Sequence, residues 1–447
     1  QHENPLGVEP INHLMARFAI PSIIAMLVSA LYNMVDQFFI GHSVGMQGNA
    51  ATNVAFPLTI TCTAVSLLFG IGGAANFNLS MGRKKPEEAK HFIGNAIFLM
   101  LSFGITLCLL VFLFLDPLLK LFGATADILT YSRTYTSITA FGFPFVILAT
   151  GGSNLVRADG SPNFSMACTL IGCLINLVLD PIFVFHMGMA GAAWATIIGQ
   201  IISASMVIWY LTRFKTVKLT LKELRPRAFA CRRILSLGMS PFLNQLAIMI
   251  VQVVMNNVLV FYGGQSVYGS EIPLACAGII SKVNMIFFSI SIGLSQGMQP
   301  IASFNYGAEN YGRVREAVIK TMTASTLICT VAFILFQLFP RQITGIFGSG
   351  SEEYFTFASR YFRIFLFFTF LNGIQPVAGN FFTAIGKPVY GIFISLTRQI
   401  LFLLPLILIL PRFFGIDGVL YSAPIADFMA AVLAFFLTFR QLNKLGK

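Results

Sequence analysis

The sequence predicts an all-α polytopic membrane protein, with twelve transmembrane helices in two six-helix bundles. Hydrophobic residues make up 56% of the chain, charged residues only 10%, and 46 of the 447 residues are Phe. A soluble core of this length could not bury so much apolar surface. The apolar residues also lie in long runs, and motifs of the first half recur in the second. These features indicate repeated membrane crossing and an internal duplication.

Twelve apolar runs are long enough to cross a bilayer, which takes about 20 helical residues. The predicted spans are 14–40, 52–77, 92–115, 131–156, 163–185, 190–212, 234–262, 273–303, 316–338, 358–384, 389–410 and 416–440.

Lys and Arg are concentrated in the connections after spans two, six and eight, and Arg157 and Lys387 add to the turns after spans four and ten. Because cytoplasmic loops carry the excess of basic residues, both termini are expected in the cytoplasm, with the protein in the plasma membrane. The net charge of +12 then follows from topology, and no nucleic-acid partner is expected. The seven cysteines show neither metal-ligand spacing nor a disulfide framework.

The two halves carry matching motifs at a nearly constant offset. GGAANFNLSMG, ending at Gly82, lies 225 residues before GMQPIASFNYG, ending at Gly307. Six spans separate the copies, so both enter the membrane in the same sense, and a pseudo-two-fold axis along the membrane normal should relate them. We therefore expect a first lobe at 1–212, a basic cytoplasmic linker at 213–233 and a second lobe at 234–447.

Two carboxylates lie inside apolar runs of the first half, Asp36 in span one and Asp180 in span five. An ionised carboxylate at mid-membrane costs roughly 2.5 to 3.5 kcal/mol on insertion scales, so each is a candidate functional residue. Both spans run outward and both acids lie near the outer ends, so the two could share a pocket. Helical spacing adds these polar neighbours: Tyr32, Asn176, Thr196 and Gln200.

Such a pocket would attract a proton or a small cation. Two close carboxylates in low dielectric do not both ionise cheaply, and Asp36, Asp180 and Asn176 would offer Na⁺ the hard oxygen ligands it prefers. The alternative is that each acid separately caps or pairs within its bundle. The repeat replaces Asp36 by Asn256, so this acidic chemistry belongs to the first half.

The second half has its own intramembrane charges, Lys282, Arg398 and Asp427. One interpretation is a structural network that pairs Asp427 with one of the bases. The other is that Lys282 or Arg398 faces a substrate cleft. Further candidates for the cleft are Gln200, Asn256, Met285 and Gln296.

The order of these motifs resembles the multidrug and toxic compound extrusion (MATE) transporters over nearly the whole chain. It rests on Pro21, Tyr32 and Asp36 in span one, NLVLDP around Asp180, GMAGAAWAT in span six, and SQGMQPIASFNYGAENYGRVREA. LTRQILFLLPLILILPRFFGIDGV near the C-terminus is similar to the bacterial branch that exports cationic drugs.

The resemblance implies antiport of mostly cationic, amphiphilic drugs against Na⁺ or H⁺, through a central cleft that opens alternately to each side. It places the cation site on Asp36, Asn176 and Asp180, with Tyr32 and Thr196 as neighbours, and a bend of span one at Pro21. No cofactor is implied, and a monomer is expected to suffice. Some members carry acids on spans seven and ten, where this chain has Asn256, Asn372 and Gln375, so no cation site is expected in the second lobe.

Three other classes of function remain open. A flippase for a lipid-linked precursor has a similar two-lobe plan, but a pyrophosphate would call for several basic groups in the cleft. A channel would not call for duplicated lobes. An enzyme is least favoured, because no nucleophile and base lie at catalytic spacing.

Overall fold

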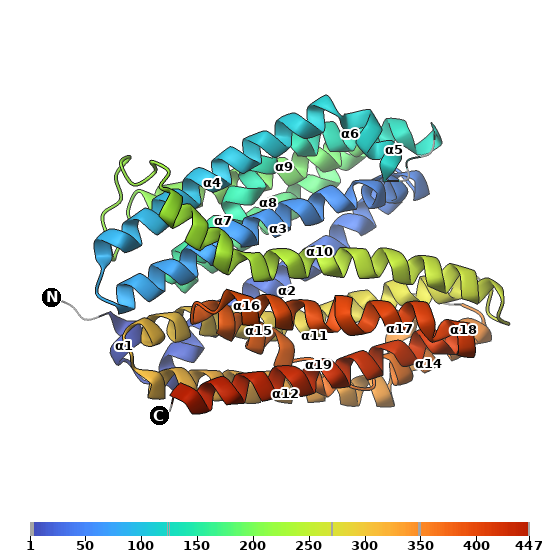
Figure 1. Ribbon diagram of the computed structural model, residues 1–447. Coiled ribbons are helices and arrows are strands. Elements are labelled where there is room, and N and C mark those ends of the chain that lie inside the picture. The colour runs from blue at the N-terminus through green and yellow to red at the C-terminus, as the bar shows by residue number, and fades with distance from the viewer. Residues whose placement is uncertain (1–3, 123, 125, 270, 347–349, 446–447) are drawn as a thin grey trace.

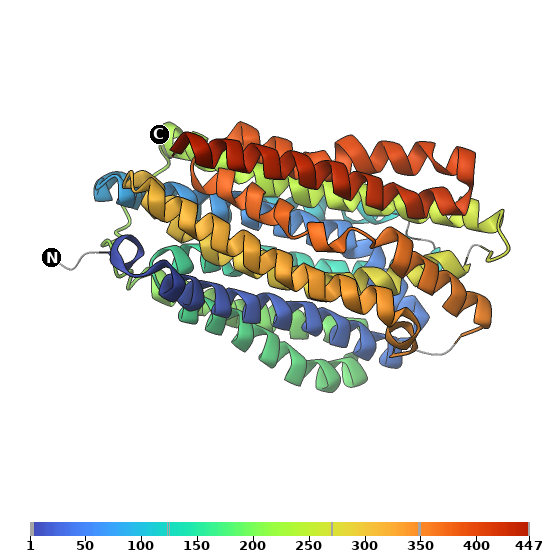
Figure 2. The same ribbon diagram turned by 90° about the horizontal axis from the view of Figure 1, so that it is seen from below.

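The computed structural model describes residues 4–122, 124, 126–269, 271–346 and 350–445, and every regular element among them is a helix. The first half of the chain forms the upper bundle in Figure 1 and the second half the lower one, with α10 running between them. Seen from below, the long helices run in one common direction (Figure 2). The prediction of an all-helical protein is confirmed.

The helices of the first half are α1 (Pro5–Val8), α2 (Ile11–Ser43), α3 (Met46–Gly82), α4 (Pro86–Leu113), α5 (Leu115–Leu121), α6 (Ala126–Phe141), α7 (Phe143–Ala158), α8 (Pro162–Met187) and α9 (Met189–Leu211). Those of the second half are α10 (Ala228–Gly264), α11 (Glu271–Gly307), α12 (Tyr311–Leu338), α13 (Pro340–Ile346), α14 (Glu352–Phe365), α15 (Ile374–Ala384), α16 (Pro388–Leu396), α17 (Leu404–Ile409), α18 (Pro411–Phe414) and α19 (Ile416–Leu445). A 3₁₀ turn (Thr369–Leu371) precedes α15, and a π-helical segment (Thr397–Leu403) joins α16 to α17.

The described residues contain ten single candidate membrane spans, and twelve when two bent helix pairs each count as one. The first pair, α6 with α7, bends by 53°, and the second, α14 with the segment ending at Ala384, bends by 41°. Pro144 at the start of α7 has no N–H to continue the ladder of α6, which accounts for the first break. The bent pairs correspond to predicted spans four and ten, so all twelve predicted spans have a counterpart.

Two basic segments differ from the sequence-based expectation. The helix α10 begins at Ala228, six residues before the predicted start of span seven, because Arg232 and Arg233 are exposed on its first turns and exposed charges do not end a helix. Arg157 was expected in the short turn after span four but lies in α7 with only 7% exposure. Its interpretation as a loop charge was wrong, because α7 continues two residues past the predicted end of span four and the residues of its last turn are buried.

The two halves meet in a symmetric helix crossing. A Cβ atom on Gly82 of α3 would lie 2.1 Å from the carbonyl oxygen of Phe304, and one on Gly307 of α11 would lie 2.3 Å from that of Leu79. Gly82 and Gly307 are the paired ends of the repeat, and Leu79 and Phe304 occupy equivalent positions in it. The crossing therefore lies on the pseudo-two-fold axis, which runs along the helices.

The first helix of each half also packs on the other half. A Cβ atom on Gly238 of α10 would lie 1.8 Å from the Leu68 carbonyl oxygen of α3, and one on Gly297 of α11 would lie 2.5 Å from the Cα atom of Ala19 in α2. Only glycine permits backbones this close. These contacts lie toward the end of the molecule that carries the termini, and the bundles diverge toward the opposite end (Figure 1).

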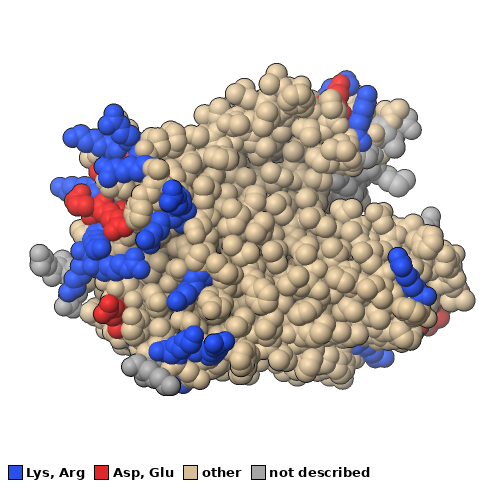
Figure 3. Space-filling view, viewed as in Figure 1, with Lys and Arg blue, Asp and Glu red and all other residues tan. Residues whose placement is uncertain are grey.

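Lys and Arg gather at the same end as the termini, whereas the broad middle of the molecule carries few charges (Figure 3). We call this end the basic end. The uncharged band matches a bilayer-spanning region, and the protein is a multi-pass membrane protein. The halves are thus in close contact near the basic end and separated away from it.

A candidate site with paired carboxylates

Asp36 of α2 and Asp180 of α8 lie side by side in the first bundle. Asp180 is fully buried and Asp36 is 9% exposed. The two carboxyl groups are close enough to interact electrostatically. The two acids, 144 residues apart in the chain, are brought together because α2 packs along α8. A proton or cation held here would contact both.

Three of the predicted neighbours line the same pocket. The Asn176 Nδ2 group donates a hydrogen bond to the Tyr32 hydroxyl, which also interacts with Thr196. Tyr32 and Asn176 each lie one helical turn before an acid, so their side chains fall on the same faces as the carboxylates. Gln200, one turn deeper on α9, is half-buried and forms no side-chain hydrogen bond with either acid.

The pocket is rich in oxygen and poor in hydrogen-bond donors. Four of its buried oxygen atoms accept no hydrogen bond from any described residue: Asp36 Oδ1, both carboxylate oxygens of Asp180 and Asn176 Oδ1. No ion pair to a described base reaches either acid. Buried oxygens without donors are costly unless a positive species satisfies them. The arrangement suits a proton or a hard cation such as Na⁺.

A transition-metal site is not indicated. The described residues contain no group of three or more His, Cys, Asp and Glu side chains that could hold a metal ion. Asp36, Asp180 and Asn176 supply oxygen atoms only, which is the donor set for Na⁺ rather than for zinc or iron.

A small apolar cluster caps the pocket toward the nearer helix ends. Ile40, Val184 and Ala192 are buried together and lie one turn beyond Asp36, Asp180 and Thr196 respectively. The Ser43 hydroxyl donates a 3.0 Å hydrogen bond to the Val184 carbonyl and so ties the end of α2 to α8.

Tyr135 of α6 also belongs to this site, although sequence reasoning missed it. It packs against the apolar cluster and lies close enough to both carboxylates to interact with them electrostatically. The available signal was the polar run YSRTYTS, residues 131–137, which breaks an otherwise apolar span. Within this run Ser132 and Thr136 are buried and Tyr135 is half-buried, whereas Arg133 is exposed.

Pro21 lies in the half of α2 that contacts the second bundle. The helix continues through it, but proline cannot donate to the carbonyl of Arg17 four residues earlier. A Cβ atom on Gly293 or Gly297 of α11 would lie within 2.7 Å of the backbone of Ile23 or Ala19, on either side of the proline. Bending α2 at Pro21 would therefore disturb its contact with α11.

The charges of the second half separate into one pair and one single base. The Arg398 Nε group donates to Asp427, which is 1% exposed. Arg398 lies in the π-helical segment, a rare geometry that often marks functional positions. Of the two bases that the sequence offered as partners for Asp427, Arg398 therefore forms the pair. Lys282 is exposed and forms no ion pair with any described residue.

Two candidate cleft residues lie on faces that turn toward the other half. Lys282 is 11 residues before Gly293 on α11, which places both within about 20° of the same helix face. Asn256 is 18 residues after Gly238 on α10, a whole number of turns. Both positions lie beyond the close contacts, where the bundles diverge. Met285 is 51% exposed, and Gln296 lines a small cavity between the halves.

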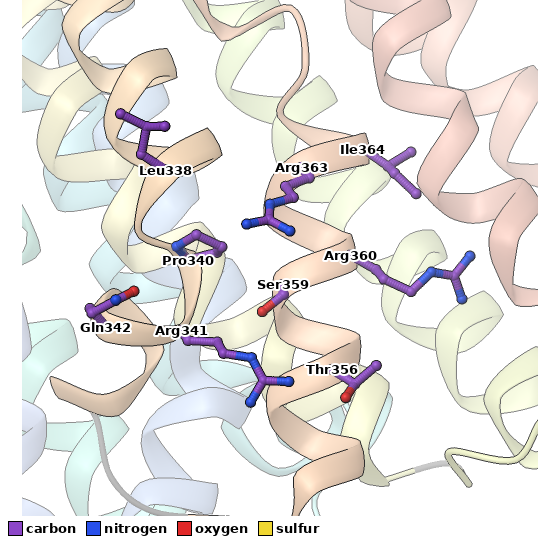
Figure 4. Close-up of a pocket in the computed structure, with 9 residues that line it drawn as sticks. All are labelled: Leu338, Pro340, Arg341, Gln342, Thr356, Ser359, Arg360, Arg363 and Ile364. Atoms are coloured by element: carbon purple, nitrogen blue, oxygen red, sulfur yellow. The ribbon is translucent and has the colours of Figure 1, made fainter.

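A separate surface pocket lies between α12, α13 and α14 (Figure 4). Three arginines line it, and each has a partner: Arg341 binds Glu352 at 2.7 Å, Arg360 binds Asp417 at 2.6 Å, and Arg363 donates to the Gln337 carbonyl at 3.2 Å. These contacts tie the ends of neighbouring helices together. No sequence-predicted site residue lines this pocket.

Comparison with known proteins identifies the family. The family model MatE matches residues 21–182 and 246–409, one segment in each half. The chain belongs to the MatE family. Membership of this transporter family confirms a membrane transporter with two six-helix lobes and argues against an enzyme. Because MATE antiporters are ion-coupled, an ion-coupled mechanism also follows.

The chain is similar along nearly its whole length to multidrug export proteins and to a solved MATE structure. It is 26% identical to the Staphylococcus haemolyticus (strain JCSC1435) multidrug export protein MepA, covering 96% of this chain and 94% of that protein. The MepA of Staphylococcus aureus (strain MSSA476) is 24% identical, with 98% and 95% covered. A solved outward-facing multidrug resistance MATE transporter of the MOP superfamily superposes with a TM-score of 0.91 at 22% identity, covering 99% of both chains.

Proposed function

We propose that this MatE transporter exports drug-like organic compounds, mostly cationic and amphiphilic, in exchange for inward-moving Na⁺ or H⁺. The observation that carries the proposal is the buried pair Asp36 and Asp180, in which three of the four carboxylate oxygens accept no hydrogen bond from a described residue. The similar MepA proteins are named multidrug export proteins, which supports this class of substrate.

The coupling ion acts at the carboxylate pair. With the site empty and both acids ionised, their repulsion and burial favour an arrangement that admits water or a cation. A proton shared between the acids, or Na⁺ held by both with Asn176 Oδ1, removes that repulsion. The helices α2 and α8 can then pack closely, so occupancy of the site biases the packing of the first bundle.

The change reaches the other bundle through α2. Pro21 interrupts the backbone hydrogen bonding of this helix, and it lies where α2 contacts Gly293 and Gly297 of α11. Repacking of α2 at the carboxylates is transmitted to this contact, which changes the affinity for a drug held between the lobes. Lys282 and Asn256 are the polar groups we assign to that cleft.

We place the basic end, with both termini, in the cytoplasm because cytoplasmic loops carry the excess of Lys and Arg. The closed contacts at this end then correspond to an outward-facing state. The six-helix halves, with the linker between α9 and α10, act as the two lobes that rock against each other.

Transport in proteoliposomes tests the proposal. Uptake of a fluorescent organic cation is measured under a Na⁺ gradient alone and under a proton gradient alone, which also identifies the ion. Asp36→Asn is expected to abolish gradient-driven transport while the protein remains folded, and Asp116→Asn is a control because Asp116 pairs with Arg133 at an exposed site. Full transport by Asp36→Asn would refute the coupling scheme.

A flippase for a lipid-linked precursor is the second candidate, because Lys282 is a free base on an inter-lobe face. Scrambling of a fluorescent lipid-linked pyrophosphate, with no gradient-driven uptake of organic cations, would favour this function over drug export.

A further inference from the structure

A small polar cavity lies between the two halves near the basic end, far from the carboxylate pair. Ala74, Ala75 and Asn78 of α3, Asn154 and Arg157 of α7, and Gln296, Gln299 and Pro300 of α11 line it. It has space for a single small group, such as one water molecule or one monatomic ion. Because both halves contribute its walls, the cavity exists only while they are closed at this end.

Arg157 brings an uncompensated positive charge into this cavity. Its side chain is 7% exposed, and among the described residues it donates to the neutral Asn154 Oδ1 atom, at 3.1 Å. The Nε donor of Arg157 finds no acceptor, and no described carboxylate forms an ion pair with it. The nearby Asp159 is engaged by Tyr210 and Thr216.

A second unused donor comes from the other half. Gln299 of α11 is 5% exposed, and its Nε2 group has no hydrogen-bond partner among the described residues. Asn78 Oδ1 is also unpaired, and rotation of this amide would present its NH₂ group instead. A water molecule could satisfy the donors but would leave the guanidinium charge unbalanced, and a buried charge is stable only when it is paired.

We propose that Arg157 and Gln299 bind a small monovalent anion of the size of chloride between the two halves. The anion neutralises Arg157 and accepts a hydrogen bond from each half, so it stabilises the state that is closed at the basic end. Opening this end separates α7 from α11, exposes Arg157 to water and releases the anion. The anion therefore stabilises one conformation and acts independently of the cation site.

The test measures the distance between the halves at the basic end in purified full-length protein in nanodiscs. Spin labels on exposed positions of the two halves report this distance. Chloride is titrated against gluconate, which is too large for the cavity, at constant ionic strength. The ratio of closed to open molecules is expected to rise about tenfold with chloride.

Variants separate the anion site from general electrostatics. Arg157→Gln should lose the chloride response, and Arg157→Lys, which keeps the charge, should retain it with altered affinity. Gln299→Glu supplies a fixed anion and should stay closed without chloride. Arg232→Gln is the control, because Arg232 is exposed on α10, and should respond like the parent.

Two results would overturn the proposal. Equal distance distributions in chloride and gluconate for the parent protein would show that chloride does not stabilise the closed state. A chloride response that persists in Arg157→Gln would show that the anion acts at another position.

Discussion

The closest approach between the two halves gives the sharpest prediction, for Gly238→Ala in α10. The added Cβ atom would lie 1.8 Å from the Leu68 carbonyl oxygen. A carbon atom and a carbonyl oxygen normally stay at least about 3.3 Å apart. The helices α3 and α10 would therefore have to separate by about 1.5 Å at this point, because both contacting groups include rigid backbone.

The cost falls on one conformation only. Forcing extra volume into a packed interface costs about 1 to 3 kcal/mol, and this strain disappears once the basic end opens. The higher helix propensity of Ala acts on both states and cancels. The ratio of closed to open molecules should consequently fall about 5- to 150-fold.

Pulsed electron paramagnetic resonance measures this ratio. Labels on Glu87→Cys and Ala308→Cys, both exposed at the basic end, report the separation of the halves in a background lacking the partly exposed native cysteines. Gly278→Ala is the matched control, since nothing lies within 4 Å of a Cβ atom there. A distance distribution for Gly238→Ala that matches the control would refute the argument that this contact holds the halves closed.

Three further predictions concern single contacts. Arg398→Met should destabilise the protein by about 3 to 5 kcal/mol, because it leaves the buried Asp427 unpaired. The double variant with Asp427→Leu should recover most of this loss, as measured by thermal unfolding. Equal melting temperatures of the single and double variants would contradict this. Asp159→Ala should lower the free energy of unfolding by about 1 to 3 kcal/mol and speed tryptic cleavage of residues 212–227. The Asp159 carboxylate accepts four hydrogen bonds, three of them from residues of that segment. Unchanged cleavage would argue against its role in holding the segment in place. Pro21→Ala should restore the backbone hydrogen bond to Arg17, stiffen α2 and slow gradient-driven transport without lowering thermal stability, whereas an unchanged rate would exclude bending at this residue.

The positions of the twelve spans and the duplication could be predicted because they depend on local properties. An apolar run of about 20 residues has few alternatives to a membrane helix, and a repeat is visible as a constant offset. Asp36 and Asp180 could be recognised for the same reason, since a carboxylate within an apolar run is visible in the sequence alone. Their approach to each other followed from matching depths alone.

Other features depended on which helix faces which. Arg157 looked like a loop charge in the sequence, but it lies in the buried last turn of α7, beside a cavity to which α11 contributes part of the wall. Asp427 could have paired with Lys282 or Arg398, and the helix geometry selected Arg398. Tyr135 joined the carboxylate site because α6 packs against α9, the helix that carries Thr196. The depth of a residue in the membrane follows from its position along its span. The partner of each side chain depends on how the helices are rotated about their axes and how they cross, and both are fixed only when all twelve spans pack together.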